Sequence, residues 1–259
     1  MKEAFNLSEE ILKKQKKIAL LENFFLITSN LETNRLKHIK TELENYLKKY
    51  KIDKQIESCL CFIEVLAAFN SDSSFDQVND IADPIFLYLS NILSWDFYDI
   101  RLFAWSASLA TTFDEAYLLS ERCLNEIEKY DQENRYPFIK SAVYSNLLTR
   151  LVFFKYLETN VNRSDNYEDR KETIDNIFSR YYEGVQHYTG ITGDKEQGDM
   201  ATLQKSLFEG DLTLQAEILQ KIKKDHSRLF YETVASMVES YGLYIKVSLF
   251  MDKQISLLN

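Results

Sequence analysis

The chain has 259 residues, of which only six are glycine and two are proline, against a combined share of about 12% in average proteins. This scarcity excludes turn-rich all-β sandwiches and barrels, and it disfavours parallel α/β folds, whose βα loops are rich in glycine. The hydrophobic share of 45% can fill a domain-sized core, while the net charge of −9 works against autonomous binding to nucleic acid. The composition therefore predicts an all-α protein.

Apolar residues recur at helical spacing in the N-terminal half, with charged residues on the opposite faces. The predicted helices there cover residues 7–27, 36–50, 52–69, 85–94 and 95–110. Ser8 is expected to cap the first of them, because a serine oxygen accepts a hydrogen bond from a free backbone N–H of the first turn. Pro84 is expected at the start of the helix over 85–94, where its missing N–H breaks no hydrogen bond.

The C-terminal half shows the same periodicity. Its predicted helices cover residues 113–130, 138–158, 200–208, 212–223 and 227–252. Thr112 and Glu115 have the spacing of a capping box at the start of the helix over 113–130. Residues 159–169 form the longest polar connection, and the glycine-rich stretch 190–199 is interpreted as a turn between helices, because it lacks the spacing of a dinucleotide-binding loop.

The helices fall into pairs that start near residues 31, 75, 113, 168 and 211. This spacing is typical of an α-solenoid, here of about five tetratricopeptide-like helical hairpins. The sharpest junction lies at Gly210 and Asp211, where glycine is expected to end one helix at positive φ, aspartate to cap the next, and Ala216 to allow close approach.

We therefore expect a single helical repeat domain over residues 1–259. It would consist of an N-terminal helix (1–30), a repeat array (31–225) and a C-terminal helix (226–259). Ordinary helical hairpins in a bundle without repeats are the alternative.

Motifs that carry catalysis are missing from the sequence. It contains no phosphate-binding loop, no H-E-x-x-H, no G-x-S-x-G and no C-x-x-C. Cys59, Cys61 and Cys123 are expected to be small buried residues of a reduced protein. We predict no enzymatic activity, no catalytic residue, no metal and no cofactor. The prediction also includes a cytoplasmic location without a membrane span, since no apolar stretch reaches about 18–20 residues.

Polar residues inside the apolar helix over 138–158 are the first candidate ligand contacts. Asn146 and Arg150 are four residues apart and therefore share a helix face, which Phe153 continues. An asparagine amide both donates and accepts, which suits the backbone of an extended peptide, and an arginine can bind a carboxylate with two hydrogen bonds.

A second candidate group lies on the helix over 95–110. Arg101 stands among apolar neighbours, and Tyr98 and Trp105 are two helical turns apart on one face. For both groups the alternative is a structural role, in which the polar atoms hydrogen-bond inside the protein and long side chains cover apolar surface.

The segment Trp95-Asp96-Phe97-Tyr98-Asp99-Ile100-Arg101-Leu102-Phe103, followed by a helix that contains Leu118-Leu119-Ser120-Glu121, resembles the C-terminal regulatory domain of Rgg/GadR/MutR-type transcriptional regulators. The resemblance implies a cytosolic homodimer of tetratricopeptide-like repeats, which acts in quorum sensing by binding a short hydrophobic signalling peptide on its concave face. It implies that Asn146 and Arg150, and less directly Arg101, hold the peptide.

The resemblance does not extend to a DNA-binding domain. Residues 1–60 lack the turn of a helix-turn-helix, so DNA binding by this chain alone is not expected. Two hypotheses follow: a peptide-sensing regulatory domain, or a protein-interaction scaffold with no small ligand. The apolar run 243–251 predicts a homodimer contact, or else a helix that folds back onto its neighbour.

Overall fold

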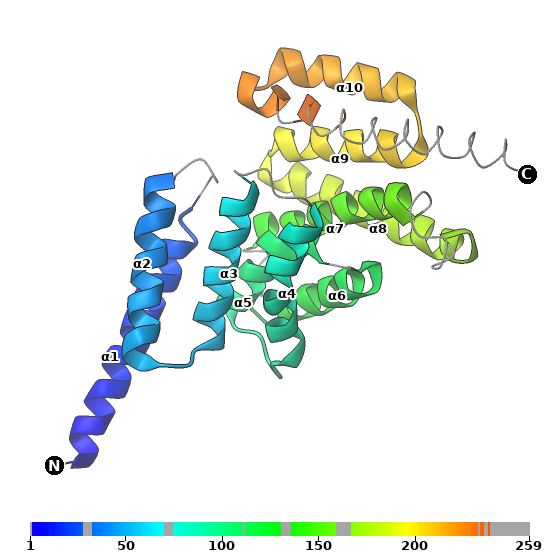
Figure 1. Ribbon diagram of the computed structural model, residues 1–259. Coiled ribbons are helices and arrows are strands. Elements are labelled where there is room, and N and C mark those ends of the chain that lie inside the picture. Colours follow the sequence, from blue (N-terminus) through cyan, green and yellow to red (C-terminus); the bar gives the residue numbers. More distant parts are fainter. Residues whose placement is uncertain are drawn as a thin grey trace, which may run out of the picture. The chain divides into compact units, whose positions relative to one another are not determined.

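The computed structural model of the protein is all-α (Figure 1) and describes residues 2–27, 33–69, 75–110, 112–130, 136–158, 167–232, 234, 235 and 238. These residues form ten α-helices and one 3₁₀-helix: α1 (Lys2–Phe24), α2 (Thr33–Tyr50), α3 (Lys54–Phe69), α4 (Phe75–Asn91), α5 (Phe97–Ser106), η1 (Ala107–Leu109), α6 (Phe113–Tyr130), α7 (Pro137–Glu158), α8 (Tyr167–Thr192), α9 (Lys195–Glu209) and α10 (Leu212–Asp225). The predicted all-α class is confirmed. None of the helices in the described ranges is long and apolar enough to cross a membrane.

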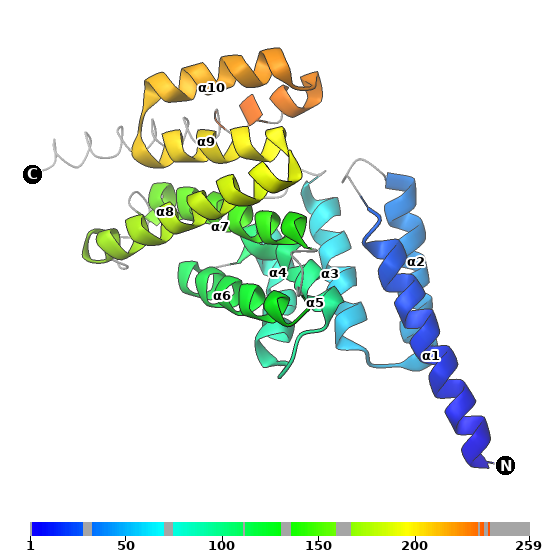
Figure 2. The same cartoon turned by 180° about the vertical axis from the view of Figure 1, so that it is seen from behind.

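The chain divides into two compact units, residues 1–115 and 116–259, which we call the N-terminal and C-terminal units. In the first, α2 packs on α1 and α3, α3 packs on α4, and α5 packs on α3 and α4. In the second, α7 packs on α8, α9 packs on both, and α10 packs on α9. Figures 1 and 2 show α3 beside α4 and α9 beside α10 from opposite sides. Helices adjacent in sequence are thus packing neighbours, whereas the single repeat domain over 1–259 stays a prediction.

The apolar stripe of α1 is buried only over its C-terminal part. Leu21 and Phe25 are almost fully buried, whereas Ile11 and Ile18 on the same stripe are 49% and 40% exposed. The expected N-cap at Ser8 was wrong, because α1 already begins at Lys2. The helix therefore continues for more than a turn before the serine.

Two features of α4 and α5 differ from the sequence expectation. Pro84 lies inside α4 and not at its start, because the helix already buries Val78 and Ala82 ahead of the proline. The aromatic segment starts α5 only at Phe97, since Asp96 caps it: the Asp96 carboxylate accepts the backbone N–H groups of Tyr98 and Asp99, and the Asp99 carboxylate accepts that of Asp96. This reciprocal pair is a capping box, which satisfies backbone donors that the first turn leaves free.

The short-range rules predict the bounds of α6 and the junction of α9 with α10. The expectation that the whole stretch 190–199 forms a turn was wrong, because α8 continues to Thr192 and α9 begins at Lys195. Helix α6 has the expected bounds, and Thr112 Oγ1 accepts the Glu115 N–H at 3.2 Å. Gly210 ends α9 with φ +74°, and Asp211 caps α10 by accepting the N–H groups of Thr213 and Leu214. Ala216, however, is exposed, so the prediction that it lets two helices approach was wrong.

The close approach occurs instead between α7 and α8, at Gly184. A Cβ built there would lie 2.7 Å from the ring of Tyr144, which itself stacks on Tyr188. We expect Gly184→Ala to destabilise the C-terminal unit by about 1 kcal/mol, because overpacking outweighs the better helix propensity of alanine. Gly190→Ala, on the same helix with open space around it, is expected to stabilise the unit by up to about 1 kcal/mol. Thermal unfolding of both variants checks the prediction, which opposite signs support and a stabilised Gly184→Ala contradicts.

Two expectations fall outside the described residues. The polar connection is described only from residue 167, where it already belongs to α8. The apolar run 243–251, on which the homodimer prediction rests, also lies outside the described ranges.

Candidate functional site

Tyr98, Arg101 and Trp105 lie together on α5 and contact the end of α1. Arg101 donates a hydrogen bond of 3.0 Å to the carbonyl oxygen of Phe25 and lies 4.4 Å from the centre of its ring. Trp105 packs against the same ring at 5.1 Å. The Tyr98 hydroxyl donates to Glu22 at 2.9 Å, and burial together with this hydrogen bond raises the pKa of Tyr98 to about 12.

These contacts favour the structural alternative for the three α5 residues. Partial burial lowers the pKa of Arg101, and its charge is used on a carbonyl oxygen and an aromatic face within the unit. A charge-assisted hydrogen bond and a cation–π contact together hold the α1 terminus. The peptide-binding role of these residues stays a prediction.

The other predicted group, Asn146, Arg150 and Phe153, lies on α7 in the C-terminal unit. Arg150 is only 5% exposed, and its guanidinium group lies 5.4 Å from the centre of the Phe153 ring. All three residues have interaction partners within the protein. The structure brings Arg150 and Phe153 together, as their spacing predicted. The burial of Arg150 is typical of a residue that packs inside the protein. Its role in binding a peptide stays a prediction.

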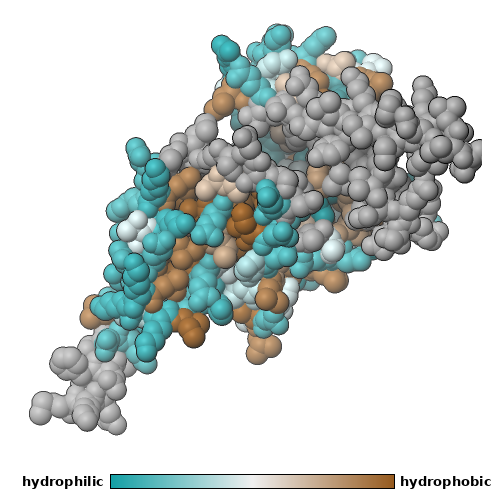
Figure 3. Space-filling view, in the orientation of Figure 1, coloured by the Kyte–Doolittle hydropathy of each residue, from teal (hydrophilic) through white to brown (hydrophobic). Residues whose placement is uncertain are grey.

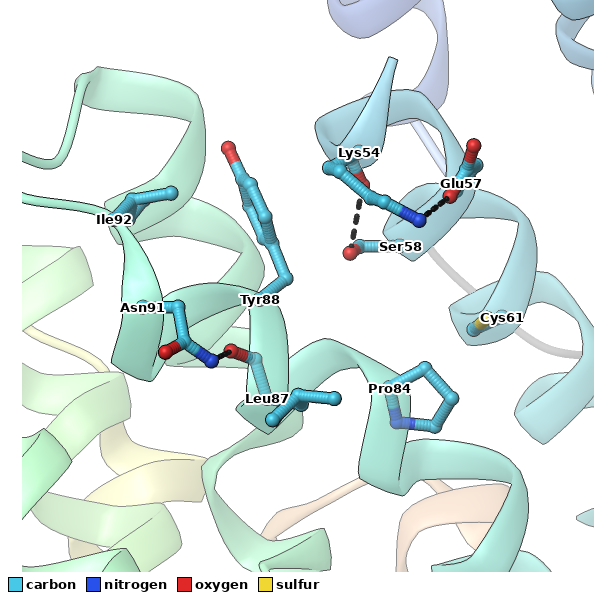
Figure 4. Close-up of a pocket in the computed structure, with 9 residues that line it drawn as sticks. All are labelled: Lys54, Glu57, Ser58, Cys61, Pro84, Leu87, Tyr88, Asn91 and Ile92. Atoms are coloured by element: carbon cyan, nitrogen blue, oxygen red, sulfur yellow. Dashed lines mark hydrogen bonds and ion pairs between the residues drawn. The ribbon is translucent and has the colours of Figure 1, made fainter. Parts of the chain in front are cut away.

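A cleft that the sequence reasoning missed lies between α3 and α4. It has a volume of about 400 Å³ and is lined mostly by apolar atoms. Figure 4 shows Ser58 and Cys61 of α3 facing Pro84, Leu87 and Tyr88 of α4. Leu87 stands at the rim with 67% of its surface exposed. We call this the α3–α4 cleft.

The ends of the α3–α4 cleft carry polar groups. Lys54 and Glu57 form an ion pair of 2.7 Å on the first turn of α3, and the Asn91 amide donates to the Leu87 carbonyl oxygen at 2.7 Å (Figure 4). An exposed ion pair of this kind contributes less than about 1 kcal/mol. A ligand can therefore break this ion pair at little energetic cost and form its own hydrogen bond with Lys54 or Glu57.

Cys61 is the one predicted buried thiol that the structure places differently. Cys59 and Cys123 are buried as expected, whereas Cys61 is partly exposed in the wall of the cleft. Partial burial and the carboxylates of Glu64 and Glu57 raise the pKa of the Cys61 thiol. The thiol is therefore protonated at neutral pH and acts as a small apolar wall group.

Tyr88 connects the cleft to a buried polar cluster. Its hydroxyl donates to Asp99 Oδ1 at 2.8 Å, and Gln55 Nε2 donates to the same oxygen at 2.6 Å. Gln55 Nε2 also lies 2.9 Å from Asp96 Oδ1. Burial and the Asp99 carboxylate raise the pKa of Tyr88. We call Gln55, Tyr88, Asp96 and Asp99 the Asp99 cluster.

The C-terminal unit has a larger and more polar cavity between α8, α9 and α10, with a volume of about 1030 Å³. At its wall Asp199 accepts from Lys221 at 2.6 Å and lies 2.8 Å from His226 Nε2. Although burial acts in the opposite direction, these hydrogen bonds hold the pKa of Asp199 below its ordinary value. The charges neutralise one another and tie α9 to α10, which is a structural arrangement. Within the described ranges, no three His, Cys, Asp or Glu side chains are placed to hold a metal ion.

The signal that could have found the α3–α4 cleft is a break in the pattern of α4. Ile85, Phe86 and Leu89 form the buried stripe of this helix, yet Pro84, Leu87 and Tyr88 continue the apolar surface around the side of the helix. In comparisons with family models, with curated proteins and with solved structures, the chain found no match.

Proposed function

We propose that the protein is a peptide-binding helical module that takes apolar side chains of a short peptide into the α3–α4 cleft. The observation that carries this proposal is the cleft itself. Its volume of about 400 Å³ lies within the range of about 300–1,000 Å³ for ligand pockets, which are mostly apolar with a few polar groups. Such a space can hold leucine- or phenylalanine-sized side chains.

The surroundings of the cleft suit a peptide better than a nucleic acid. Figure 3 shows apolar surface between hydrophilic side chains over the N-terminal unit. Asn91 at the cleft is exposed and, besides the N–H that it gives to Leu87, has a second N–H and an amide oxygen that can hydrogen-bond an extended backbone. The net charge of −9 repels phosphate backbones on average. A chain of this kind would act as the peptide-sensing domain of a regulator of the Rgg type, as the sequence resemblance suggests.

We also propose that the helical hairpins are tetratricopeptide-like repeats. Two observations support the proposal: helices adjacent in sequence pack on each other, and the junction between α9 and α10 combines a left-handed Gly210 with the N-cap Asp211. A hairpin array offers grooves between successive helices as binding surfaces.

Substitution of a rim residue tests the peptide-binding proposal. We expect Leu87→Glu to weaken binding of an apolar peptide at least tenfold, because it places a carboxylate at the mouth of an apolar cleft. The measurement is fluorescence anisotropy with an array of labelled octapeptides built from Leu, Ile, Phe, Val, Gly and Ser.

The matched control is Leu93→Glu, which makes the same change at a fully exposed leucine of the same unit that does not line the cleft. It is expected to leave the affinity within about twofold of the starting protein. An array in which no octapeptide binds below millimolar concentration, or an equal loss in both variants, would contradict the proposal.

A further inference from the structure

The α3–α4 cleft shares one wall with a buried carboxyl group. Asp99 is 3% exposed, and three donors point at it: Gln55 Nε2 and the Tyr88 hydroxyl at Oδ1, and the Asp96 backbone N–H at Oδ2. Tyr88 belongs both to this cluster and to the lining of the cleft. The hydrogen bond from its hydroxyl group to Asp99 therefore fixes the position of the Tyr88 ring in the wall of the cleft.

One acceptor in the Asp99 cluster is unused. The Oε1 atom of Gln55 is buried and has no hydrogen-bond partner, although the same side chain donates through Nε2. A buried acceptor without a donor costs about 1–3 kcal/mol. A donor that the cluster can acquire is a proton on a carboxyl group, because rotation of the Gln55 amide would then satisfy its oxygen.

Building on the proposed function, we infer that protonation of the Asp99 carboxyl group controls peptide binding in the α3–α4 cleft through Tyr88. When Asp99 is ionised, the Tyr88 hydroxyl makes a hydrogen bond to a charged acceptor and the ring is fixed in the wall. When Asp99 takes up a proton from water, that bond becomes a neutral one, and the carboxyl O–H turns to Gln55 or to Asp96. The tyrosine ring is then held less strongly and moves into the cleft more readily.

The polar and titratable groups around Asp99 set the pH at which this happens. Asp96 adjoins it at the start of α5, Cys59 and Gln55 face it from α3, and Tyr88 faces it from α4, while Asp53 ahead of α3 acts on Tyr88 and Cys59. Burial, followed by the Asp96 carboxylate, raises the pKa of Asp99 to about 6, in spite of its hydrogen bonds. Proton uptake thus falls in the physiological range.

The expected size of the effect follows from the hydrogen bond alone. Hydrogen bonds to charged groups contribute about twice as much as neutral ones, and loss of that difference corresponds to about a fivefold change in an equilibrium constant. We therefore expect the peptide to bind about fivefold more weakly at pH 5 than at pH 7.5.

Two measurements on the full chain test the inference. Ring signals of ¹³C-labelled tyrosine, with Tyr88 assigned by their loss in Tyr88→Phe, follow the cluster without any ligand, and they are expected to shift with a midpoint near pH 6. Anisotropy of the best octapeptide, chosen without acidic or histidine residues, follows binding between pH 5 and 7.5.

Asp99→Asn is expected to abolish both pH dependences, whereas Asp80→Asn, the same change at an exposed position of α4, retains them. Tyr88→Phe keeps the ring and removes the hydroxyl group, so it should flatten the pH dependence of binding even where Asp99→Asn folds poorly. Peptide binding that does not change with pH, or a Tyr88 shift that survives Asp99→Asn, would overturn the inference alone. If the Tyr88 ring signals shift with pH but no peptide binds, the proposed function is overturned, and with it the inference that Asp99 controls binding.

Discussion

Replacing Phe24 with alanine is expected to lower the free energy of unfolding of the N-terminal unit by about 3–5 kcal/mol. The Phe24 side chain is fully buried, and its ring centre lies 6.0 Å from that of Phe62 on α3 and 5.9 Å from that of Trp105 on α5. Removal of the ring leaves a cavity between α1, α3 and α5. The hydrogen-bonded backbone of each helix is rigid and cannot move inward far enough to fill it. Such a cavity collapses only in part, so the lost contacts are not replaced.

Urea denaturation measures this loss, and Leu12→Ala is its control. Leu12 lies on the same helix but is 61% exposed, so its truncation should change the free energy of unfolding by less than about 0.5 kcal/mol. Hydrogen exchange adds a local reading, because α1 should lose protection before α3 and α4 do. Equal effects of the two substitutions would show that the C-terminal part of α1 is not packed as the structure describes.

The same experiment bears on the predicted α5 ligand residues. Arg101 and Trp105 contact Phe25, and Tyr98 donates to Glu22. The three side chains are only partly exposed, so a peptide gains full access to them when the end of α1 leaves. Release of α1 in Phe24→Ala would uncover them. An octapeptide that binds this variant better than the starting protein would therefore favour a ligand role for the α5 group over the structural one.

Features governed by neighbouring residues were the ones that the sequence predicted well. The bounds of α6 and the left-handed Gly210 before the N-cap Asp211 depend on side chains within four residues of the backbone groups that they satisfy. Two expectations that failed, those for Pro84 and Ala216, depended on what packs against a helix, whereas the Ser8 cap failed because α1 already begins at Lys2. Pro84 is tolerated inside α4, and Ala216 is exposed although its size suited an interface.

The α3–α4 cleft and the Asp99 cluster lay beyond the sequence for the same reason. Gln55 and Asp99 are 44 residues apart, and Tyr88 comes from a third helix. In the sequence, Asp99 is only one acidic position in an aromatic segment that a family resemblance drew attention to. Its burial, its three donors and the tyrosine between it and the cleft arise only when α3, α4 and α5 pack together.

Asp99 is also expected to make the N-terminal unit more stable in acid than at neutral pH, by up to about 3 kcal/mol. Burial raises its pKa from the ordinary value of 3.8 to about 6 in the folded protein, so folding favours the protonated group. The resulting stability is fully present below about pH 4 and is lost as the pH rises through 6. A change of about 2 in the pKa of this group between the unfolded and the folded protein corresponds to about 3 kcal/mol.

The difference in unfolding free energy between Asp99→Asn and the starting protein isolates this carboxyl group, because all other titrating groups are common to both. Between pH 4 and pH 7 the difference should change by up to about 3 kcal/mol in favour of the variant, since asparagine has no charge to bury. Asp80→Asn makes the same change at an exposed position of α4 and is the matched control, which should not reproduce the change seen for Asp99→Asn. A slope of opposite sign for Asp99→Asn would mean that the donors from Gln55, Tyr88 and the Asp96 backbone stabilise the carboxylate by more than burial and the neighbouring Asp96 charge destabilise it. Asp99 would then be an anchor that is ionised at every physiological pH, and the cleft would keep its shape throughout that range.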